Sequence, residues 1–207
     1  MMKGKFITLE GPDGSGKTTI SKIVYDKLSA EGYKVLLTRE PGGIDISEQI
    51  RNIILDKKNI TMEARTEALL YAAARRQHLI EKVKPALDND YIVICDRFVD
   101  SSLVYQGVAR KIGIDEVYQI NLFAIGDIMP DLTVFFDIPY EVGLARIEKN
   151  ARVVDRLDLE SKEFHKKVYE GYMIICDKYS DRITKIDANR TIEEVVDQVI
   201  AVIKSEL

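Results

Sequence analysis

The segment 11–18, GPDGSGKT, constrains the fold more than any other part of this chain. It has the spacing G-x-x-x-x-G-K-[ST], and it joins the apolar run 6–9 to a helical pattern that starts near Thr19. In such a turn, backbone N–H groups close around phosphate oxygens at the positive end of a helix. Lys17 would add a charge on the outer phosphates, and Thr18 an oxygen for Mg²⁺. An ordinary Gly-rich turn rarely has this spacing and context, so we expect a phosphate-binding loop.

The length and composition fit one globular domain, which we expect to span residues 1–207. Apolar residues make up 46% and charged residues 31%, a balance that argues against a disordered chain. The net charge is −4, whereas proteins that bind nucleic acids typically have an excess of basic residues. No signal-peptide core or membrane-spanning run is evident, so we expect a cytoplasmic protein with no nucleic-acid or membrane partner.

The cysteines and histidines show no metal-ligand spacing. Cys95 lies in an apolar run and Cys176 in a helical pattern, and we expect both to be reduced core thiols. His78 and His165 lie on charged helical stretches without a ligand-spaced Cys or His, so we expect both on the solvated surface.

Short runs rich in β-branched and aromatic residues alternate with helical patterns. All but the last run are nearly uniformly apolar, as is typical of strands buried on both faces. The alternation predicts a parallel sheet with helices on both faces, a three-layer α/β sandwich of the P-loop NTPase type with five strands. The expected strands are 5–9, 34–38, 91–95, 132–137 and 182–186, and the expected helices are 17–31, 47–56, 62–87, 101–110, 115–126, 139–150, 159–179 and 191–204.

Two segments depart from this alternation. The loop 39–46, REPGGIDI, follows the carboxyl end of a strand, where open parallel sheets bind ligands, so we expect it to hold a second ligand. The segment 149–158, KNARVVDRLD, is a short charged connection between two long helices. Its arginines are typical of a mobile lid, which we place at about 146–158.

Asp96 and Arg97 directly follow a buried strand pattern. A strand-end carboxylate near a P-loop commonly supports Mg²⁺, and a guanidinium can hold a phosphate through two parallel hydrogen bonds. We therefore expect a metal site at Thr18 and Asp96, and two phosphates meeting at Arg97. A surface ion pair is the alternative. Asp137 ends another apolar run, but the Ile-Pro that follows offers no phosphate ligand, which ranks it second.

Two missing patterns narrow the reaction. The Asn-Lys-x-Asp pattern for guanine is absent, and Arg97 stands where many P-loop ATP hydrolases have glutamate, so hydrolysis is disfavoured. If the acceptor is itself a phosphate, no general base is required, and catalysis can depend on positioning and charge neutralisation.

A planar base could bind between Tyr71 and Arg75, which stand four residues apart on one helical face. The ring would stack on the base, and the guanidinium would meet its polar edge. Ser102, Tyr105 and Gln106 begin a helical pattern just past the strand end. The alternatives are a core tyrosine beside a surface arginine, and an ordinary polar helix start.

Taken together, these motifs resemble the thymidylate kinase family. The DR…SSxxYQG combination is the most specific of them. The resemblance implies transfer of the ATP γ-phosphoryl group to dTMP with Mg²⁺, in a homodimer whose contact includes the helix 62–87. The matching stretches run in family order over most of the chain and are 6–19, 38–43 (TREPGG), 67–76, 96–107 (DRFVDSSLVYQG) and 155–157.

The resemblance also implies roles for individual residues. The catalytic set would be Lys17, Asp96, Arg97, Arg152 and Arg156, with Thr18 and Asp96 at the metal. ATP would bind Gly11, Pro12, Asp13, Gly14, Ser15, Gly16, Lys17, Thr18, Thr19 and Arg146. The nucleotide dTMP would bind Asp13, Arg39, Glu40, Pro41, Arg51, Tyr71, Arg75, Arg97, Ser102, Tyr105 and Gln106.

The implied acceptor contacts divide by the part of dTMP that they meet. Asp13 would face the sugar, and Tyr105 would fill the space of a ribose 2′-hydroxyl, which favours deoxyribose. Arg75 would contact the thymine carbonyl, with Ser102 and Gln106 on its remaining polar edge.

The phosphate of dTMP would lie near Arg39 and Arg51, although Glu40 could neutralise Arg39. On the donor side, Arg97 would bridge the two phosphates, and Asp96 would hold Arg97 and the metal shell.

Gly14 stands where one branch of the family has a P-loop arginine. This chain resembles the other branch, in which the lid supplies the cation. Arg146, Arg152 and Arg156 are then the candidates, and the sequence does not choose among them.

Other activities stay open on the residues alone. A deoxynucleoside kinase would need a carboxylate base near a 5′-hydroxyl, and Glu10 at the end of the first strand could serve. Another nucleoside monophosphate could be the acceptor. A P-loop switch or ATP-binding regulator would need a partner-facing switch loop, whereas these loops are filled with candidate acceptor ligands.

Overall fold

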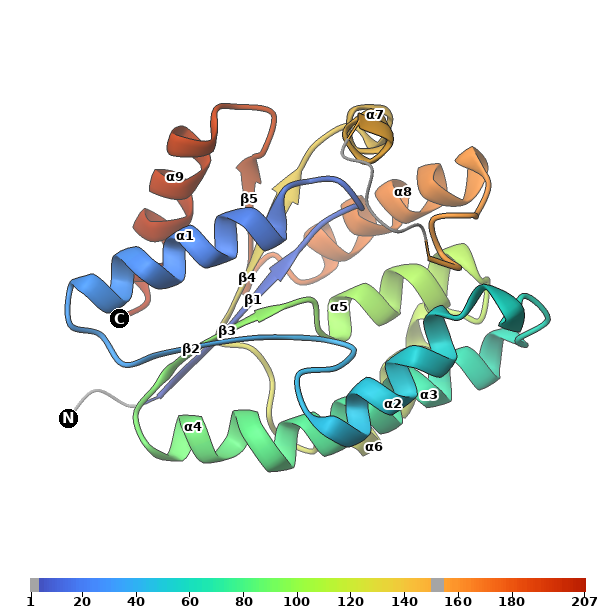
Figure 1. The fold of residues 1–207 in the computed structure, drawn as a ribbon, viewed down its shortest axis with the longest axis horizontal. Coiled ribbons are helices and arrows are strands. Elements are labelled where there is room, and N and C mark those ends of the chain that lie inside the picture. Colours follow the sequence, from blue (N-terminus) through green and yellow to red (C-terminus); the bar gives the residue numbers. More distant parts are fainter. Residues whose placement is uncertain (1–3, 150–154) are drawn as a thin grey trace.

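The computed structural model describes residues 4–149 and 155–207. Five parallel strands form one sheet in the order β2-β3-β1-β4-β5, with helices on both faces (Figure 1). This confirms the predicted α/β sandwich, including the strand expected at 182–186, whose apolar pattern is the weakest of the five. The strands are β1 (Lys5–Glu10), β2 (Val35–Arg39), β3 (Ile92–Asp96), β4 (Leu132–Asp137) and β5 (Ile183–Asp187).

The helices follow the predicted pattern with one difference in backbone geometry. The α-helices are α1 (Lys17–Ala30), α2 (Asp45–Leu55), α3 (Ala64–His78), α4 (Lys84–Asp88), α5 (Val99–Ser102), α6 (Ile114–Ile125), α7 (Tyr140–Lys149), α8 (Lys162–Lys178) and α9 (Ile192–Ser205). A short 3₁₀ turn, η1 (Lys57–Asn59), follows α2. Two further segments, η2 (Leu79–Val83) and η3 (Leu103–Ala109), are π-helical and so have wider turns than predicted. Such turns are frequent at functional sites, and residue propensities carry no signal for them.

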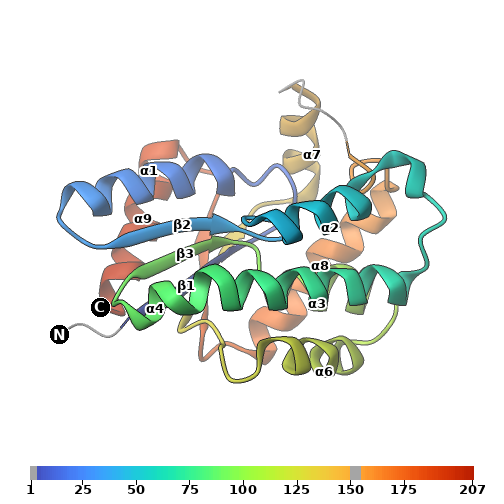
Figure 2. The same ribbon diagram turned by 60° about the horizontal axis from the view of Figure 1, so that its bottom comes forward.

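Side chains of the central strands alternate between two apolar cores, because successive strand residues point to opposite faces. In β1, Phe6 packs into the core that α8 and η3 cover, whereas Ile7 and Leu9 pack into the core beneath α1 and α9. Figure 2 shows α2, α3 and α6 lying along one side of the molecule, with α4 continuing the line of α3. The edge strand β5 has exposed positions at Thr184 and Lys185, which explains its weaker apolar pattern.

The parallel arrangement brings the loops of the predicted site to one edge of the sheet. In the strand register, Asp96 of β3 stands between Leu9 of β1 and Arg39 of β2. The P-loop, the loop 39–46 and the segment after Asp96 therefore start at the same level, as predicted for an open parallel sheet.

The cysteines lie as expected, but the histidines do not. Cys95 and Cys176 are free and buried. His78 and His165 are also buried, with exposed fractions of 0% and 5%, so their predicted surface location is wrong. The neighbouring charged residues Arg76, Glu81 and Lys166 are exposed, but Arg75 is buried as His78 is. A charged stretch does not reveal which face each residue occupies. None of the helices in the described ranges has the length and apolarity that a membrane crossing requires.

Candidate active site

A cavity of about 640 Å³ lies at the carboxyl edge of the sheet. Predicted site residues that line it are Asp13, Gly14, Ser15, Gly16, Lys17, Thr18, Thr19, Arg39, Glu40, Pro41, Arg51, Tyr71, Arg75, Asp96, Arg97, Ser102, Tyr105, Gln106 and Arg146. Gly11, Pro12 and Arg156 lie outside this lining, and Arg152 lies outside the described residues. Arg190 and Ile192, which follow β5, also line the cavity, although no sequence motif marks them.

Lys17 is folded back onto the loop that carries it. Its Nζ donates to the carbonyl oxygens of Gly11 and Pro12 at 2.9 and 3.0 Å, and to Ser15 Oγ at 3.0 Å. Burial and the charge of Arg97 lower the pKa of Lys17 to about 8. A polyphosphate bound in the loop would favour the charged ammonium and compete for these hydrogen bonds.

The P-loop contacts α7 backbone to backbone. Gly14 has a φ of 76°, and a Cβ at this position would lie 2.1 Å from the carbonyl oxygen of Gly143. A Cβ at Gly143 would lie 2.3 Å from the carbonyl oxygen of Asp13. Neither position has room for a side chain in this arrangement, which explains why residue 14 cannot be an arginine here.

Arg97 connects the end of β3 to the P-loop. Its backbone is left-handed, with a φ of 69°. Nη2 donates to Asp13 Oδ1 at 2.7 Å, and Nη1 donates to Ser101 Oγ at 3.0 Å and to Tyr172 Oη at 3.2 Å. The guanidinium also lies 5.0 Å from the centre of the Tyr105 ring. These contacts fix a partly buried cation beside the phosphate-binding loop.

Asp13 remains ionised under all ordinary conditions. Burial opposes its charge, but Arg97, Lys17 and the Tyr105 hydroxyl, which donates to Oδ2 at 2.8 Å, lower its pKa to about 2. We expected Asp96 to hold Arg97, but the carboxylate that binds this guanidinium is that of Asp13. Sequence adjacency did not reveal this pairing, because it spans two strands.

Glu10 anchors the segment after β3. It accepts hydrogen bonds from the backbone N–H of Phe98 at 2.7 Å, the N–H and hydroxyl of Ser101 at 3.2 and 2.6 Å, and Tyr172 Oη at 2.8 Å. Burial and the charge of Asp100 raise its pKa, which Arg97 partly offsets. The carboxylate is therefore occupied in holding the residues on either side of the Arg97 site.

The predicted metal ligands are in direct contact. Thr18 Oγ1 donates to Asp96 Oδ2 at 2.7 Å, and both residues line the cavity. The competing acid, Asp137, accepts from Tyr169 Oη at 3.1 Å beside a separate, shallower hollow. A hydroxyl and a carboxylate oxygen are hard ligands, so this pair fits Mg²⁺.

Two arginines converge on one carbonyl oxygen in the loop after β2. Arg39 and Arg51 each donate from Nη1 to the carbonyl oxygen of Pro41, at 3.0 and 2.9 Å. Burial and the charge of Arg39 lower the pKa of Arg51, as expected for neighbouring cations. The sequence suggested that Glu40 could neutralise Arg39, but the carboxylate that pairs with Arg39 is that of Glu48, at 2.8 Å. The pair of guanidinium groups makes this corner suited to a phosphate.

Arg75 is buried at the inner end of the cavity. Its Nε donates to Glu40 Oε2 at 2.7 Å, Nη1 to Ser102 Oγ at 3.1 Å and to Asn121 Oδ1, and Nη2 to the carbonyl oxygen of Phe98 at 2.9 Å. These bonds use four of its five N–H groups and leave one Nη2 hydrogen for a ligand. Tyr71 lines the cavity one helical turn away, so the predicted stacking pair faces a common space.

The carboxylate of Glu67 binds Gln106 and Arg156, two side chains that we expected to contact the substrates. It is fully buried and accepts from Gln106 Nε2 at 2.8 Å, from Arg110, and from Arg156 Nη2. Arg156 Nε also donates to the carbonyl oxygen of Ile54 at 2.7 Å. A catalytic role for Arg156 would require release from these partners, whereas Arg146 already lines the cavity.

Comparisons with known proteins show which family the chain resembles. The family model described as thymidylate kinase matches residues 9–199. The chain is 58% identical to a thymidylate kinase of Bacillus cytotoxicus, over the full length of both chains. It is 60% identical to one of Clostridium novyi, over 99% of this chain and 100% of the relative. A crystal structure of thymidylate kinase from Ehrlichia chaffeensis is similar with a TM-score of 0.78 and 34% identity, over 97% of this chain and 98% of that one.

Replacing Gly143 by Ala tests the contact between the P-loop and α7. The added Cβ would press on the Asp13 carbonyl oxygen, so the loop and helix must separate. We expect G143A to weaken binding of a nonhydrolysable ATP analogue about tenfold in calorimetry, since small displacements at such sites are costly. Helix propensity alone would stabilise the variant by about 1 kcal/mol. E148A, at an exposed position on α7, is the control. Equal affinity in G143A and E148A would contradict the contact.

Proposed function

The chain belongs to the thymidylate kinase family, and from this premise we propose that it transfers the γ-phosphoryl group of ATP to dTMP, giving ADP and dTDP. The observation that carries the proposal is the contact between Arg97 and Asp13. It places a partly buried cation at the end of β3 beside the loop suited to the donor phosphates. Two phosphates bound in this cavity would therefore meet at Arg97.

A phosphate acceptor makes a general base unnecessary, because its oxygens are already ionised at neutral pH. A dTMP phosphate oxygen forms a bond to the γ-phosphorus, and the bond to the bridging oxygen breaks with its electron pair staying on ADP. The protein must hold two polyanions in line and offset their charge. Lys17 would exchange its loop oxygens for phosphate oxygens, and Arg97 would span donor and acceptor.

Thr18 and Asp96 would hold Mg²⁺. Their oxygens already lie within hydrogen-bonding distance at the edge of the cavity, at 2.7 Å. When bound, the ion neutralises charge on the donor phosphates.

The acceptor would bind in three parts. Arg39 and Arg51 would hold its phosphate, because their guanidinium groups converge on the Pro41 carbonyl oxygen in the lining of the cavity. Tyr71 would stack on the base, while the remaining N–H of Arg75 would donate to a thymine carbonyl. Tyr105 would limit space at the sugar 2′ position. The other expected dTMP ligands are Asp13, Glu40, Pro41, Ser102 and Gln106.

We propose Arg146 as the lid cation that reaches the transferring phosphoryl group. It lies on α7 and lines the cavity beside the P-loop, whereas the Arg156 side chain is buried against Glu67. The third candidate, Arg152, lies outside the described residues. A lid over 146–158 would also exclude water, so that the phosphoryl group reaches dTMP and not solvent.

The rival activities have less support. Glu10 would be the base of a deoxynucleoside kinase, but it already accepts hydrogen bonds from Phe98, Ser101 and Tyr172. A nucleotide-binding switch would not need paired arginines on the acceptor side. The single-domain organisation, the cytoplasmic location and the lack of a nucleic-acid partner remain predictions from the sequence.

An enzyme-coupled assay of ADP release tests the proposed reaction. We expect turnover with dTMP and none above background with thymidine, because the site offers phosphate ligands in place of a base. Omission of Mg²⁺ should abolish the signal. Turnover with thymidine, or with another monophosphate but not with dTMP, would overturn the substrate assignment.

Alanine variants separate the lid candidates. R146A should lower kcat by at least about 10³-fold while dTMP affinity persists, as for other arginines that reach a transferring phosphoryl group. R156A should instead lower the melting temperature, since it removes one of the two arginines that pair with the buried carboxylate of Glu67. Loss of kcat in R156A with normal stability and normal kcat in R146A would reverse the assignment.

We also propose that two copies of this chain pair through the face formed by α3, η2 and α6. Large apolar side chains are exposed there, with Phe123 at 94%, Leu69 at 56% and Ile80 at 42%. Arg76 Nη1 donates to the carbonyl oxygen of Ala124 at 3.2 Å, which joins α3 and α6 into one surface. An apolar face of this kind is typical of a protein interface.

The variant F123E tests this pairing by placing a charge at the centre of the apolar face. We expect wild-type protein to sediment as a dimer and F123E as a monomer at micromolar concentration. I174E changes a comparably apolar exposed residue on α8 and should remain dimeric. A monomeric wild type, or a dimeric F123E, would contradict the proposed face.

A further inference from the structure

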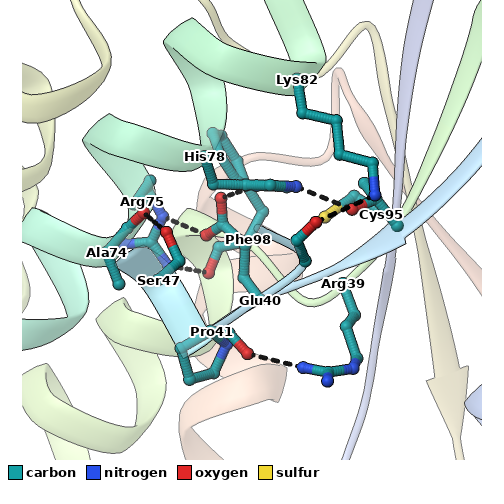
Figure 3. A network of polar contacts seen from close by, with 12 residues as sticks. Arg39, Glu40, Pro41, Ser47, Ala74, Arg75, His78, Lys82, Cys95 and Phe98 are labelled. Atoms are coloured by element: carbon teal, nitrogen blue, oxygen red, sulfur yellow. Dashed lines mark hydrogen bonds and ion pairs between the residues drawn. The ribbon is translucent and has the colours of Figure 1, made fainter. Parts of the chain in front are cut away.

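A buried chain of polar contacts lies behind the cavity and connects β2 to Arg75 (Figure 3). Thr38 Oγ1 lies 2.7 Å from His78 Nε2. His78 Nδ1 lies 2.9 Å from Glu40 Oε1, and the other carboxylate oxygen of Glu40 accepts from Arg75 Nε at 2.7 Å. None of these four residues is more than 6% exposed. We call this set, Thr38, His78, Glu40 and Arg75, the buried polar chain.

The donor and acceptor capacities of these groups determine which atom carries the hydrogen in each contact of the buried polar chain. An ionised Glu40 can only accept, so the hydrogen between it and His78 must belong to Nδ1. In a neutral imidazole, Nε2 is then an acceptor, and the Thr38 hydroxyl can donate to it. Each polar group has a partner, and the carboxylate is balanced by one guanidinium. His78 therefore limits the carboxylate to the orientation that Arg75 requires.

The same region brings together three residue types that can bind metals. Ligand atoms of Glu40, His78 and Cys95 lie within 4.8 Å of one another. However, Cys95 Sγ donates to the carbonyl oxygen of Arg97 at 3.1 Å, and burial with the charge of Glu40 holds its pKa well above the usual range. The thiolate that a metal needs is disfavoured, and Arg75 already compensates the carboxylate. The cluster is better explained as a hydrogen-bond network.

The loop after β2 covers the outer end of the buried polar chain. Gly43 has a φ of 85°, and a Cβ there would lie 2.7 Å from Thr38 Oγ1 and 3.1 Å from His78 Nε2. Lys82 Nζ donates to the carbonyl oxygen of Gly43 at 3.0 Å and ties this loop to η2. The backbone therefore packs directly on the bond between Thr38 and His78, which keeps competing water away from it.

We propose that His78 is a positioning residue for recognition of the acceptor base, because it orients Glu40, which in turn fixes the guanidinium of Arg75. This inference rests on the proposed function, in which Arg75 donates to a carbonyl of the base. His78 itself does not line the cavity. Its effect on the reaction must therefore pass through Glu40 and Arg75.

The arrangement predicts which kinetic constant depends on His78. Arg75 has a single N–H group left for a ligand, so a small rotation of its guanidinium would misdirect that hydrogen. The polar partners of His78 are Thr38 and Glu40, and none of the phosphate ligands Lys17, Arg39 and Arg97 is among them. Loss of the His78 contact should therefore weaken dTMP binding and leave ATP binding and the transfer step nearly unchanged.

Steady-state kinetics of two His78 variants test this proposal. H78F keeps an aromatic ring and removes both hydrogen-bonding nitrogens. It should raise KM for dTMP by about 10- to 100-fold, as expected when a buried charged hydrogen bond is lost, while KM for ATP and kcat change less than about threefold. H78N keeps an N–H near the position of Nδ1 and should restore most of the dTMP affinity.

A pair of threonine variants provides the test if H78F does not fold. T38V removes the hydroxyl at the outer end of the buried polar chain and should raise KM for dTMP about two- to fivefold, as for loss of one neutral hydrogen bond. T133V removes a comparably buried strand hydroxyl that bonds Thr8 at 2.8 Å and Asp100 at 3.0 Å, and it should leave KM for dTMP unchanged.

The outcomes distinguish the inference from the proposed function. Failure of the wild-type protein to phosphorylate dTMP would refute the function itself. Normal wild-type activity with H78F and T38V matching T133V in KM for dTMP would overturn the role of His78. An H78N variant as impaired as H78F, or a loss of kcat with unchanged KM, would also contradict positioning through Glu40.

Discussion

The partly buried ion pair between Arg97 and Asp13 is the interaction on which the arrangement of the site depends. It joins the P-loop to the end of β3, and so joins the donor half of the cavity to the acceptor half. Burial disfavours both charges, yet the pKa of Asp13 is about 2, and Tyr105 and Asp13 hold that of Arg97 above its usual value. Such a pair is maintained only when its geometry and surrounding hydrogen bonds are favourable. Glu10 supplies that support by binding the backbone and hydroxyl of Ser101, next to the arginine.

Buried carboxylates also position guanidinium groups in and around the cavity before any ligand arrives. Glu40 holds Arg75, which lines the cavity, and Glu67 holds Arg110 and Arg156 outside the lining. Arg39 and Arg51 differ, because both converge on a single carbonyl oxygen. Preorganised charges cost little reorganisation at the moment of reaction, which suits a phosphoryl transfer that needs positioning more than acid–base chemistry. Arg146, the proposed lid cation, lines the same cavity from α7.

The sequence predicted those parts of the fold and site that follow from strand ends and fixed spacings. The parallel sheet, the P-loop and the meeting of Thr18 with Asp96 all follow from the rule that parallel strands present their carboxyl ends at one edge. It did not predict which partner each charge would choose. Glu48, and not Glu40, pairs with Arg39, and Asp13, and not Asp96, binds the guanidinium of Arg97. His78 is buried and not on the surface. These errors share a cause, since pair choice depends on side-chain directions across elements that periodicity does not resolve. The close approach of Gly14 to Gly143 was equally hidden, because it joins residues far apart in the chain.

A double-mutant cycle on Asp13 and Arg97 tests the central claim most directly. The quantity to measure is kcat/KM for dTMP in wild-type protein, D13N, R97Q and the double variant. If the ion pair acts as one unit linking the two halves of the site, the double variant should lose little beyond the worse single variant, with a coupling energy of at least about 1.4 kcal/mol. Losses that add to within about 0.5 kcal/mol would show two independent residues and contradict the account.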